Sequence, residues 1–371
     1  MVDRHVRVER SGFFGEVGRA FLAIPIGILL FLGSFAVLFL TEGRTNEAKV
    51  AAASSVVSAE SAGGQDGQFV SVTGELGTQD PVGDPDYLAA GDWLAVNRDV
   101  EMYAWTEDSR TEERKRAGGG TDRITYYEYS EQWVSKPDDS QRFDRPEGHQ
   151  NPLMRIQSNQ FASSQATIGA WSFNATEAQL PSPSPLSLAG AELKGEAAKG
   201  TVSGDFVYLG AGTAQAPRIG DLRISWEALP AGTRATAFAE GNGSGLVAHM
   251  HKGDTRMFRV VRGGRDEAIS TLLAEFKMLG WVGRIAGFGM MWIGMMMVFA
   301  PLHEVLDILP FMGSMSRGLA MVATLPIALV LTTVTVVISM ILHSVVALAL
   351  IGVLLAGWIG WMIKNRKAQT A

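Results

Sequence analysis

Long tracts without Asp, Glu, Lys or Arg constrain this chain more than any other feature of its sequence. They run from Ala20 to Thr41, from Ile285 to Leu302 and from Gly318 to Ile363. A helix needs about 20 apolar residues to cross the hydrocarbon core, and a charge at mid-depth costs about 3 kcal/mol on insertion scales. The last tract is long enough for two crossings. The sequence therefore predicts four transmembrane helices, over residues 20–41, 279–302, 318–340 and 342–363.

The long segment between the first two predicted helices, residues 42–277, changes to the period-two alternation that is typical of strands. The predicted strands cover residues 69–76, 100–107, 124–134, 205–209, 221–226, 234–239 and 256–261. The proline-rich stretch 137–200 reads as loops with short elements, and the charged stretch 107–123 as an exposed hairpin loop. The predicted fold class is an α+β membrane protein with a large β-rich domain inserted between transmembrane helices 1 and 2.

Basic residues flank the outermost tracts. The tail 1–19 carries Arg4, Arg7, Arg10 and Arg19, and the tail 364–371 carries Lys364, Arg366 and Lys367. Positive charge favours the cytoplasmic side, so both tails are predicted to be cytoplasmic and residues 42–277 extracytoplasmic, which in a bacterial inner membrane means periplasmic. The first tract exceeds the apolar region of a signal peptide, about 7–15 residues, and is interpreted as a retained anchor. Cleavage near Ala51–Ala53 is the alternative.

Composition excludes several classes of function. The net charge of −6 offers no basic field for nucleic acid. The absence of cysteine excludes disulfides, thiolate metal sites and cysteine catalysis. Two segments, Gly67–Asp84 and Gly204–Asp221, each combine Phe-Val with a later Pro and a Gly-Asp pair. A duplicated β unit and coincidence both explain this similarity.

A series of motifs resembles the LUMA family, also called transmembrane protein 43. The first motif follows the first tract, the main block spans 100–152, and a later motif lies at 220–223. Their residues are Glu42, Gly43 and Arg44; Glu101, Tyr103 and Trp105; Tyr127, Tyr129 and Trp133; Phe143, Asp144, Arg145, His149, Asn151 and Pro152; Gly220, Asp221 and Arg223. Their order and spacing resemble the family over nearly the whole chain.

The resemblance implies a four-pass protein whose large domain faces away from the cytoplasm. Family members are described as self-associating organisers of membrane protein complexes and of envelope structure, with no established enzymatic activity. The Ala- and Gly-rich composition looks bacterial, so partners of the eukaryotic nuclear lamina do not carry over. The expected function is a non-enzymatic scaffold without cofactor or metal. Its expected partners are the lipid bilayer, further copies of the chain, and unidentified membrane or periplasmic proteins.

Two histidine motifs offer chemistry. His249 and His251 would point the same way on a strand and with Asp254 could hold a metal, although a pair of surface histidines is the favoured interpretation. In the other motif, His149 could act as a general base oriented by Asp144 or Glu147 in a membrane-anchored hydrolase. A structural turn is favoured there, because the chain has no Gly-x-Ser-x-Gly nucleophile motif.

Two further hypotheses concern the membrane. Predicted helices over residues 45–60 and 266–278 would lie along the headgroups in a lipid or envelope-stress sensor. Gly283, Gly287 and Gly294 fall near one helix face, which either allows close helix approach or reflects ordinary membrane-helix composition. His343 is predicted at the extracytoplasmic surface, and no predicted span holds an Asp or Glu, which argues against an ion-coupled transporter.

Overall fold

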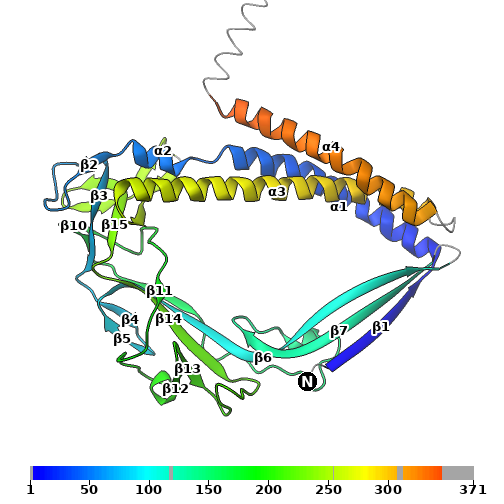
Figure 1. The fold of residues 1–371 in the computed structure, drawn as a ribbon, viewed down its shortest axis with the longest axis horizontal. Coiled ribbons are helices and arrows are strands. Elements are labelled where there is room, and N and C mark those ends of the chain that lie inside the picture. Colours follow the sequence, from blue (N-terminus) through cyan, green and yellow to red (C-terminus); the bar gives the residue numbers. More distant parts are fainter. Residues whose placement is uncertain (1–2, 117–119, 254, 307–311, 345–371) are drawn as a thin grey trace, which may run out of the picture. The chain divides into compact units, whose positions relative to one another are not determined.

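A computed structural model describes residues 3–116, 120–253, 255–306 and 312–344 (Figure 1). The chain divides into two compact units. The first holds residues 1–7, 46–112 and 124–274, and the second holds residues 8–45, 113–123 and 275–371. The first is the β-rich domain, and the second contains most of the long helices.

The described elements are mostly short strands and long helices. The helices are α1 (Phe13–Glu42), α2 (Glu47–Ala52), α3 (Arg265–Leu306) and α4 (Met312–Leu342), with 3₁₀ turns at Ser140–Arg142 and Ala197–Lys199. The strands are β1 (Asp3–Ser11), β2 (Ser55–Val57), β3 (Phe69–Thr78), β4 (Val82–Asp84), β5 (Leu88–Gly91), β6 (Trp93–Lys115), β7 (Thr121–Val134), β8 (Asn159–Ala162), β9 (Ala166–Ile168), β10 (Trp171–Phe173), β11 (Ser184–Pro185), β12 (Thr201–Ser203), β13 (Phe206–Leu209), β14 (Leu222–Pro230), β15 (Arg234–Asn242), β16 (Gly245–Val247), β17 (His249–His251), β18 (Thr255–Met257) and β19 (Arg259–Arg262).

The larger sheet has the order β1-β7-β6-β14-β13-β12, with β8 also pairing β6 and β11 pairing β14. Its strand β6 alternates strictly, so that Val100, Met102 and Ala104 face one side and are buried. In the neighbouring strand β14, Ile224 lies opposite Val100, and Ile224 and Trp226 pack in the same core. One face of this sheet is therefore a hydrophobic core, and the other is free to carry polar and aromatic side chains.

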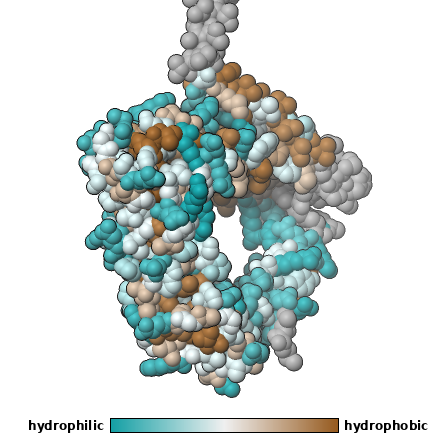
Figure 2. Space-filling view, turned by 60° about the vertical axis from the view of Figure 1, so that its left-hand side comes forward, coloured by the Kyte–Doolittle hydropathy of each residue, from teal (hydrophilic) through white to brown (hydrophobic). Residues whose placement is uncertain are grey.

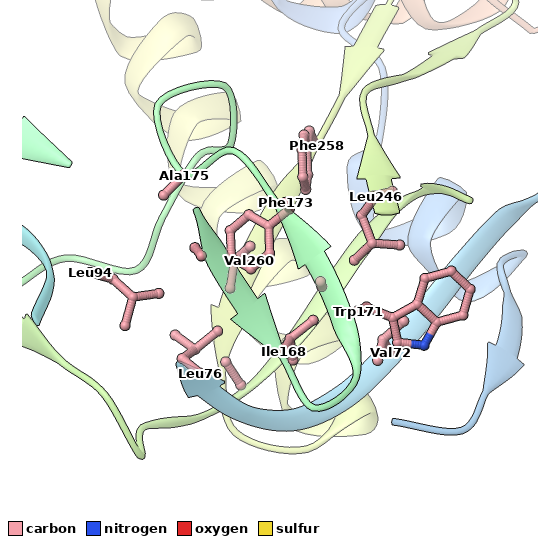
Figure 3. Close-up of a cluster of buried hydrophobic side chains, with 14 of the residues drawn as sticks. Val72, Leu76, Leu94, Ile168, Trp171, Phe173, Ala175, Leu246, Phe258 and Val260 are labelled. Atoms are coloured by element: carbon pink, nitrogen blue, oxygen red, sulfur yellow. The ribbon is translucent and has the colours of Figure 1, made fainter. Parts of the chain in front are cut away.

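The smaller sheet has the order β19-β15-β16-β10-β9-β3-β2, with β15 also pairing β3 along their lengths. Its core gathers side chains from strands that are far apart in the sequence, as the close-up in Figure 3 shows. Trp171 is 1% exposed, and its indole Nε1 donates to the carbonyl of Ser58 at 2.9 Å. A buried indole nitrogen needs such a partner, so this bond fixes the orientation of the largest core side chain.

Three described helices are long and apolar enough to span a membrane, over Phe14–Ala52, Arg265–Leu302 and Met321–Leu342. Large apolar side chains remain exposed along them, and Figure 2 shows apolar residues gathered over the helices on one face. Exposed apolar surface of this extent suits lipid as the solvent. The structure thus has both membrane-capable helices and a large β-rich domain. The predicted helix 342–363 lies almost wholly outside the described residues.

Glycines bring α1 and α3 close together. A Cβ on Gly294 would lie 2.7 Å from the carbonyl oxygen of Gly27, and one on Gly287 would lie 2.5 Å from the Leu38 side chain. A Cβ on Gly283 would likewise clash with the Thr41 side chain. The glycine stripe of α3 therefore does form a helix-packing surface, in line with the first of the two interpretations above.

The structure differs from the sequence predictions at several boundaries. Residues 3–11 of the predicted tail 1–19 form β1, which pairs with β7, and α1 already begins at Phe13. The predicted helix 45–60 is only α2 followed by β2, because Ser54 and β-branched Val56 and Val57 end it. The predicted loop 107–123 is mostly strand, since β6 runs to Lys115 and β7 starts at Thr121. The predicted helices 266–278 and 279–302 form one continuous helix, α3.

Candidate functional site

The polar face of the larger sheet collects most of the motif residues. Alternation along β6 turns Glu101, Tyr103 and Trp105 away from the core that buries Met102 and Ala104. In the neighbouring strand β14, Arg223 pairs opposite Glu101. We call this surface the aromatic face and define it by Glu101, Tyr103, Trp105, Tyr127, Tyr129, Trp133, Arg223 and the loop residues 143–152 that contact them.

The first half of the aromatic face is centred on Arg223. Its guanidinium donates to the carboxylate of Glu101 and lies 4.9 Å above the Trp133 ring. Trp133 in turn lies 5.3 Å from the Tyr103 ring. A guanidinium held between a carboxylate and an indole is fixed in position but remains partly exposed, with 33% of its side chain accessible. Such planar, half-exposed groups suit protein recognition.

Asp221 fixes the loop beside this half. Its carboxylate accepts hydrogen bonds from the Tyr208 hydroxyl and from the backbone N–H groups of Ala211, Gly212 and Arg218. Burial by itself would raise the pKa of Asp221, but these hydrogen bonds outweigh it and the pKa is lowered from 3.8. Burial, together with the bond to Asp221, raises the pKa of Tyr208. Asp221 is therefore a structural anchor, not an exposed binding group.

Gly220 allows this loop to meet β6. Its φ of +93° is unfavourable for other residues, and a Cβ there would lie 2.8 Å from the Pro152 ring. The backbone of Tyr103 bonds to both neighbours, its N–H to Asp221 O at 2.8 Å and its carbonyl to Gly220 N at 2.9 Å. The motifs at 100–105, 152 and 220–223, distant in the sequence, thus meet in one place.

The second half of the aromatic face is built around His149, which is 4% exposed. Its ring stacks on Tyr129 at 4.0 Å and meets Trp105 edge-on at 4.7 Å. Tyr129 is fully buried and also contacts Phe143 at 6.1 Å. Burial, followed by the nearby Glu107 carboxylate, raises the pKa of Tyr129, so the phenol stays neutral at any physiological pH.

Asn151 joins the loop 143–152 to β6. Its side-chain oxygen accepts from Trp105 N at 2.8 Å, and its amide nitrogen donates to Trp105 O at 2.9 Å and to Asp138 O at 3.1 Å. The asparagine side chain therefore substitutes for a neighbouring strand at Trp105. This explains why an asparagine at this position suits the fold, independently of any ligand.

The predicted dyad of His149 and Asp144 does not have the arrangement of a general base. His149 Nδ1 donates to the carbonyl of Arg145 at 3.0 Å, and Nε2 faces Asp3 at 3.4 Å. Asp144 instead pairs with Arg7 at 2.8 Å and His5 at 3.4 Å. Both ring nitrogens of His149 are thus engaged, and Asp144 does not orient its ring. The Arg145 side chain is exposed.

A groove of about 360 Å³ lies next to Tyr127, between β1, β6 and β7. It is lined by Arg4, His5, Val6, Asp108, Ser109, Arg110, Glu112, Tyr126, Tyr127 and Glu128. His5 stacks on Tyr127 at 6.3 Å, and Arg4 pairs with Glu128 at 3.4 Å. Its mixed charges favour neither an anion nor a cation.

The histidines proposed for a metal are arranged differently from a metal site. His249 Nδ1 pairs with Glu240 at 3.0 Å, and its ring stacks on Phe69 at 4.5 Å. The rings of His249 and His251 are 6.4 Å apart, and Asp254 lies outside the described residues. Among the described residues no group of three or more potential ligands could hold a metal ion.

The motif after the first tract belongs to the helical unit. Glu42 accepts from Arg284 on α3 at 2.7 and 3.0 Å, and Arg44 donates to Phe276 O at 3.2 Å. A Cβ on Gly43 would lie 2.4 Å from the His343 ring, so only glycine fits there. These residues connect α1, α3 and the end of α4, and the motif is explained by helix packing.

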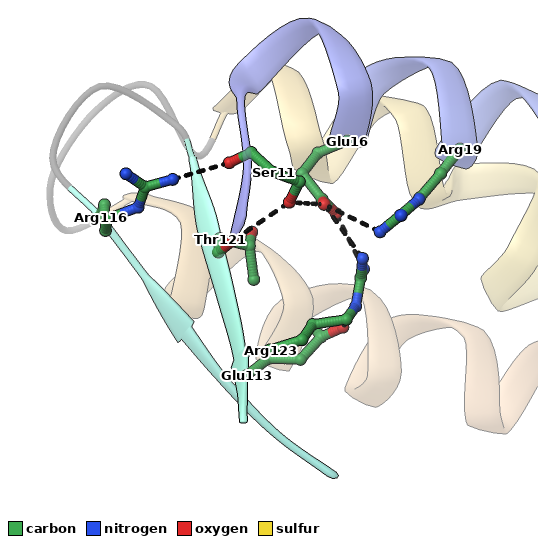
Figure 4. A network of polar contacts seen from close by, with 7 residues as sticks. All are labelled: Ser11, Glu16, Arg19, Glu113, Arg116, Thr121 and Arg123. Carbon is green, nitrogen blue, oxygen red and sulfur yellow. Dashed lines mark hydrogen bonds and ion pairs between the residues drawn. The ribbon is translucent and has the colours of Figure 1, made fainter. Parts of the chain in front are cut away.

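Two buried charge clusters were not predicted from the sequence. Arg98 points into the core side of β6 and pairs with Asp84. Glu16, only 3% exposed near the start of α1, accepts from Ser11 and from both Nη atoms of Arg123, at 3.2 and 2.9 Å (Figure 4). The available signals were an arginine two residues before a predicted strand and a carboxylate shortly before an apolar tract.

Together, the apolar helices and the β-rich domain define an integral membrane protein. The chain belongs to the family described as Transmembrane protein 43, which matches residues 102–345. It is 28% identical to Transmembrane protein 43 of Mus musculus, over 94% of this chain and 92% of the relative. The human protein is 27% identical over 82% of this chain and 81% of the relative. No solved structure matches the chain.

Within the family, a Drosophila melanogaster homolog is 30% identical over 34% of this chain and 36% of its own length. The family match contains the aromatic face from Tyr103 to Pro152 and the motif at 220–223. The motif at 42–44 and the strand β1 lie before the matched residues.

Proposed function

We propose that this protein is a non-enzymatic membrane scaffold that self-associates and binds partner proteins through its β-rich domain. The observation that carries this proposal is the aromatic face, where Trp133, Tyr103 and Arg223 are held in fixed positions and remain partly exposed. Tryptophan, tyrosine and arginine are the residues most enriched at the energetic centres of protein interfaces.

Leu153 adds an apolar contact beside this face. It is 97% exposed and follows Pro152, which packs against Gly220. This exposed side chain contributes no hydrophobic burial in the isolated chain, whereas burying it against a partner would contribute about 2 kcal/mol. The arrangement of the engaged His149 gives no comparable support to a hydrolase.

Self-association is tested by blue-native electrophoresis of the detergent-extracted protein. Leu153→Ser and Trp133→Ala are expected to shift the protein from oligomer to smaller species while thermal unfolding changes little. Val56→Ser is the matched control, because Val56 is 70% exposed on β2 of the other sheet. A wild-type protein that is strictly monomeric, and that captures no partner by cross-linking in its native membrane, would falsify the scaffold proposal.

We further propose that residues 42–277 face the periplasm of a bacterial inner membrane. The basic residues Lys364, Arg366 and Lys367 support this orientation, since positive charge is retained in the cytoplasm. Alkaline phosphatase inserted at the exposed Gly190 is expected to be active, because it folds only outside the cytoplasm. If β-galactosidase inserted at Gly190 is active instead, residues 42–277 face the cytoplasm and this orientation is wrong.

A further inference from the structure

A groove of about 400 Å³ lies between α3 and α4, within the helical unit. Most of its lining is apolar and comes from both helices, including Trp281, Ile285, Phe288, Leu329 and Val336. Trp281 and Ile285 are 62% and 65% exposed, although both belong to a helix that is apolar enough to span a membrane. Large exposed apolar side chains on such a helix face lipid, so the groove is open to the bilayer.

The two threonines of the groove have already used their hydroxyl protons. Thr332 Oγ1 donates to the sulfur of Met291 at 3.5 Å, and Thr333 Oγ1 donates to the carbonyl of Leu329 at 2.8 Å. A polar ligand would therefore lose hydration in the groove without gaining a hydroxyl donor. The interior of the groove suits a hydrocarbon chain.

The length of the groove matches one leaflet of a bilayer. Hydrogen bonds between α3 and α4 show that the two helices run antiparallel (Figure 1). Arg284 and Met340 therefore line one end of the groove, and Leu329 lines it further along. The 11 positions from Leu329 to Met340 span about 16 Å of helix, which is about half of a hydrocarbon core of about 30 Å.

The end of the groove at Arg284 is polar. The guanidinium donates through Nε and Nη2 to the carboxylate of Glu42, at 2.7 and 3.0 Å, and lies 5.5 Å from the Trp281 ring. Its side chain is 29% exposed, and Nη1 donates to no group among the described residues. An arginine beside a tryptophan is typical of the membrane–water interface, so this end lies at headgroup depth.

A second arginine gives this end a net positive charge. Arg44 lies against α3 one turn before Arg284, since a Cβ on Gly280 would be 3.3 Å from Arg44 Nη2. Arg44 donates to two backbone carbonyls, at 3.0 and 3.2 Å, and these carry no formal charge. The cluster of Glu42, Arg44 and Arg284 therefore has one positive charge in excess, which an anionic phosphate would neutralise.

We propose that the groove binds one phospholipid with an anionic headgroup. Its phosphate accepts hydrogen bonds from Arg284 and Arg44, and one acyl chain lies along the groove toward Leu329. A zwitterionic lipid carries its own cation and is attracted less by the excess positive charge. The site does not depend on the scaffold proposal, and its test involves no partner protein.

Native mass spectrometry of the full-length protein tests this site. The detergent-solubilised protein is incubated with phosphatidylglycerol or with phosphatidylcholine of the same acyl chains. We expect one retained phosphatidylglycerol per chain, preferred about fivefold over phosphatidylcholine, because a cation near the membrane surface contributes about 1 kcal/mol. Equal retention of the two lipids, or none, by the wild-type protein overturns the proposal.

Two pairs of variants locate the lipid. Thr333→Trp fills the groove and is expected to lower phosphatidylglycerol retention about tenfold, whereas Val334→Trp, at a neighbouring side chain that is 47% exposed outside the groove, should leave it unchanged. Arg44→Gln is expected to remove the preference for phosphatidylglycerol, and Arg142→Gln, at a side chain that is 87% exposed in the β-rich domain, should preserve it. Equal effects within either pair contradict the assignment.

A phosphatidylglycerol with a photoreactive group at the end of one acyl chain identifies the occupant directly. Cross-links in the wild-type protein are expected at Leu329 and Phe288, and they should disappear in Thr333→Trp while labelling of other helix faces persists. If another part of the chain, such as residues 345–363, fills the groove, the label reaches other faces but not Leu329, and the proposal is wrong.

Discussion

Arg98 Nη1 lies 2.8 Å from both carboxylate oxygens of Asp84, and the two side chains are 6% and 0% exposed. Alternation along β6 turns Arg98 toward the core, where a lone guanidinium would be very costly. Trp226 Nε1 donates to the same carboxylate at 3.1 Å, and Arg98 Nε donates to Gln157 O at 3.0 Å. The buried pair is therefore satisfied by further hydrogen bonds, which is the condition for tolerating it.

Replacing one partner of this pair is expected to be strongly destabilising. Asp84→Asn leaves the Arg98 charge buried without its counter-charge, at a cost of about 3–5 kcal/mol. Thermal unfolding of the detergent-solubilised protein, followed by tryptophan fluorescence, measures the change. The double variant Asp84→Asn/Arg98→Met is expected to lose much less than the sum of the single losses. Additive losses would contradict a direct coupling between the two residues.

The lowered pKa of Asp221 predicts that the folded protein loses stability in acid. Its pKa is lowered in the folded protein, so the unfolded chain takes up the proton first as the pH falls. The stabilisation is fully present above the ordinary pKa of 3.8 and is lost as the pH falls through the lowered value. Asp221→Asn is expected to cost about 2 kcal/mol at pH 7 and to flatten the acid limb of the melting-temperature profile. If the melting temperatures of the two proteins fall in parallel as the pH is lowered, Asp221 contributes nothing to the acid sensitivity.

The contact between α1 and α3 predicts that leucine substitutions at two glycines of α3 change the melting temperature by different amounts. Gly294→Leu places a side chain against Gly27 O and Phe31, whereas a Cβ on Gly289 would have nothing within 4 Å. Gly294→Leu is expected to lower the melting temperature in detergent through a packing penalty of about 1–3 kcal/mol, and Gly289→Leu is expected to change it little. Equal effects of the two substitutions would indicate a general effect of helix composition and not a specific contact.

Local patterns predicted the strands well where burial on one face imposes alternation. The predicted strands 100–107 and 124–134 lie within β6 and β7, whose Tyr103 and Trp133 rings are 5.3 Å apart. The core carboxylates were not predicted, because Asp84 and Asp221 look like ordinary turn residues in the sequence. Their partners come from Arg98 and from Tyr208, and only the three-dimensional arrangement makes those pairs visible.

The N-terminal strand shows a different limit of sequence reasoning. Residues 5–9 alternate polar and apolar side chains, but this run is short and lies directly before a long uncharged tract, so it was interpreted as part of a tail. The pairing of β1 with β7 depends on a partner more than a hundred residues away, and no local pattern encodes it. The same is true of His149, whose neighbour in space is Asp3 and not the nearby Asp144.

Asn151 gives a final prediction that separates folding from recognition at the aromatic face. Its side chain makes three hydrogen bonds, two of them to the backbone of Trp105. Asn151→Ala is expected to cost about 2–3 kcal/mol, because the backbone groups of Trp105 lose their partners. It should also release loop 143–152, so that proteolysis there becomes faster.

The matched control is Asn159→Ala, since Asn159 is exposed and its side chain bonds only locally, to Gln160 N at 2.9 Å. Limited proteolysis and thermal unfolding are measured on both variants beside the wild type. Because Asn151 acts through the backbone, its loss should lower oligomer content only in proportion to the unfolded fraction. Leu153→Ser, by contrast, should lower it in fully folded protein. An Asn151→Ala protein as stable as the wild type would contradict the role of this side chain as a substitute strand.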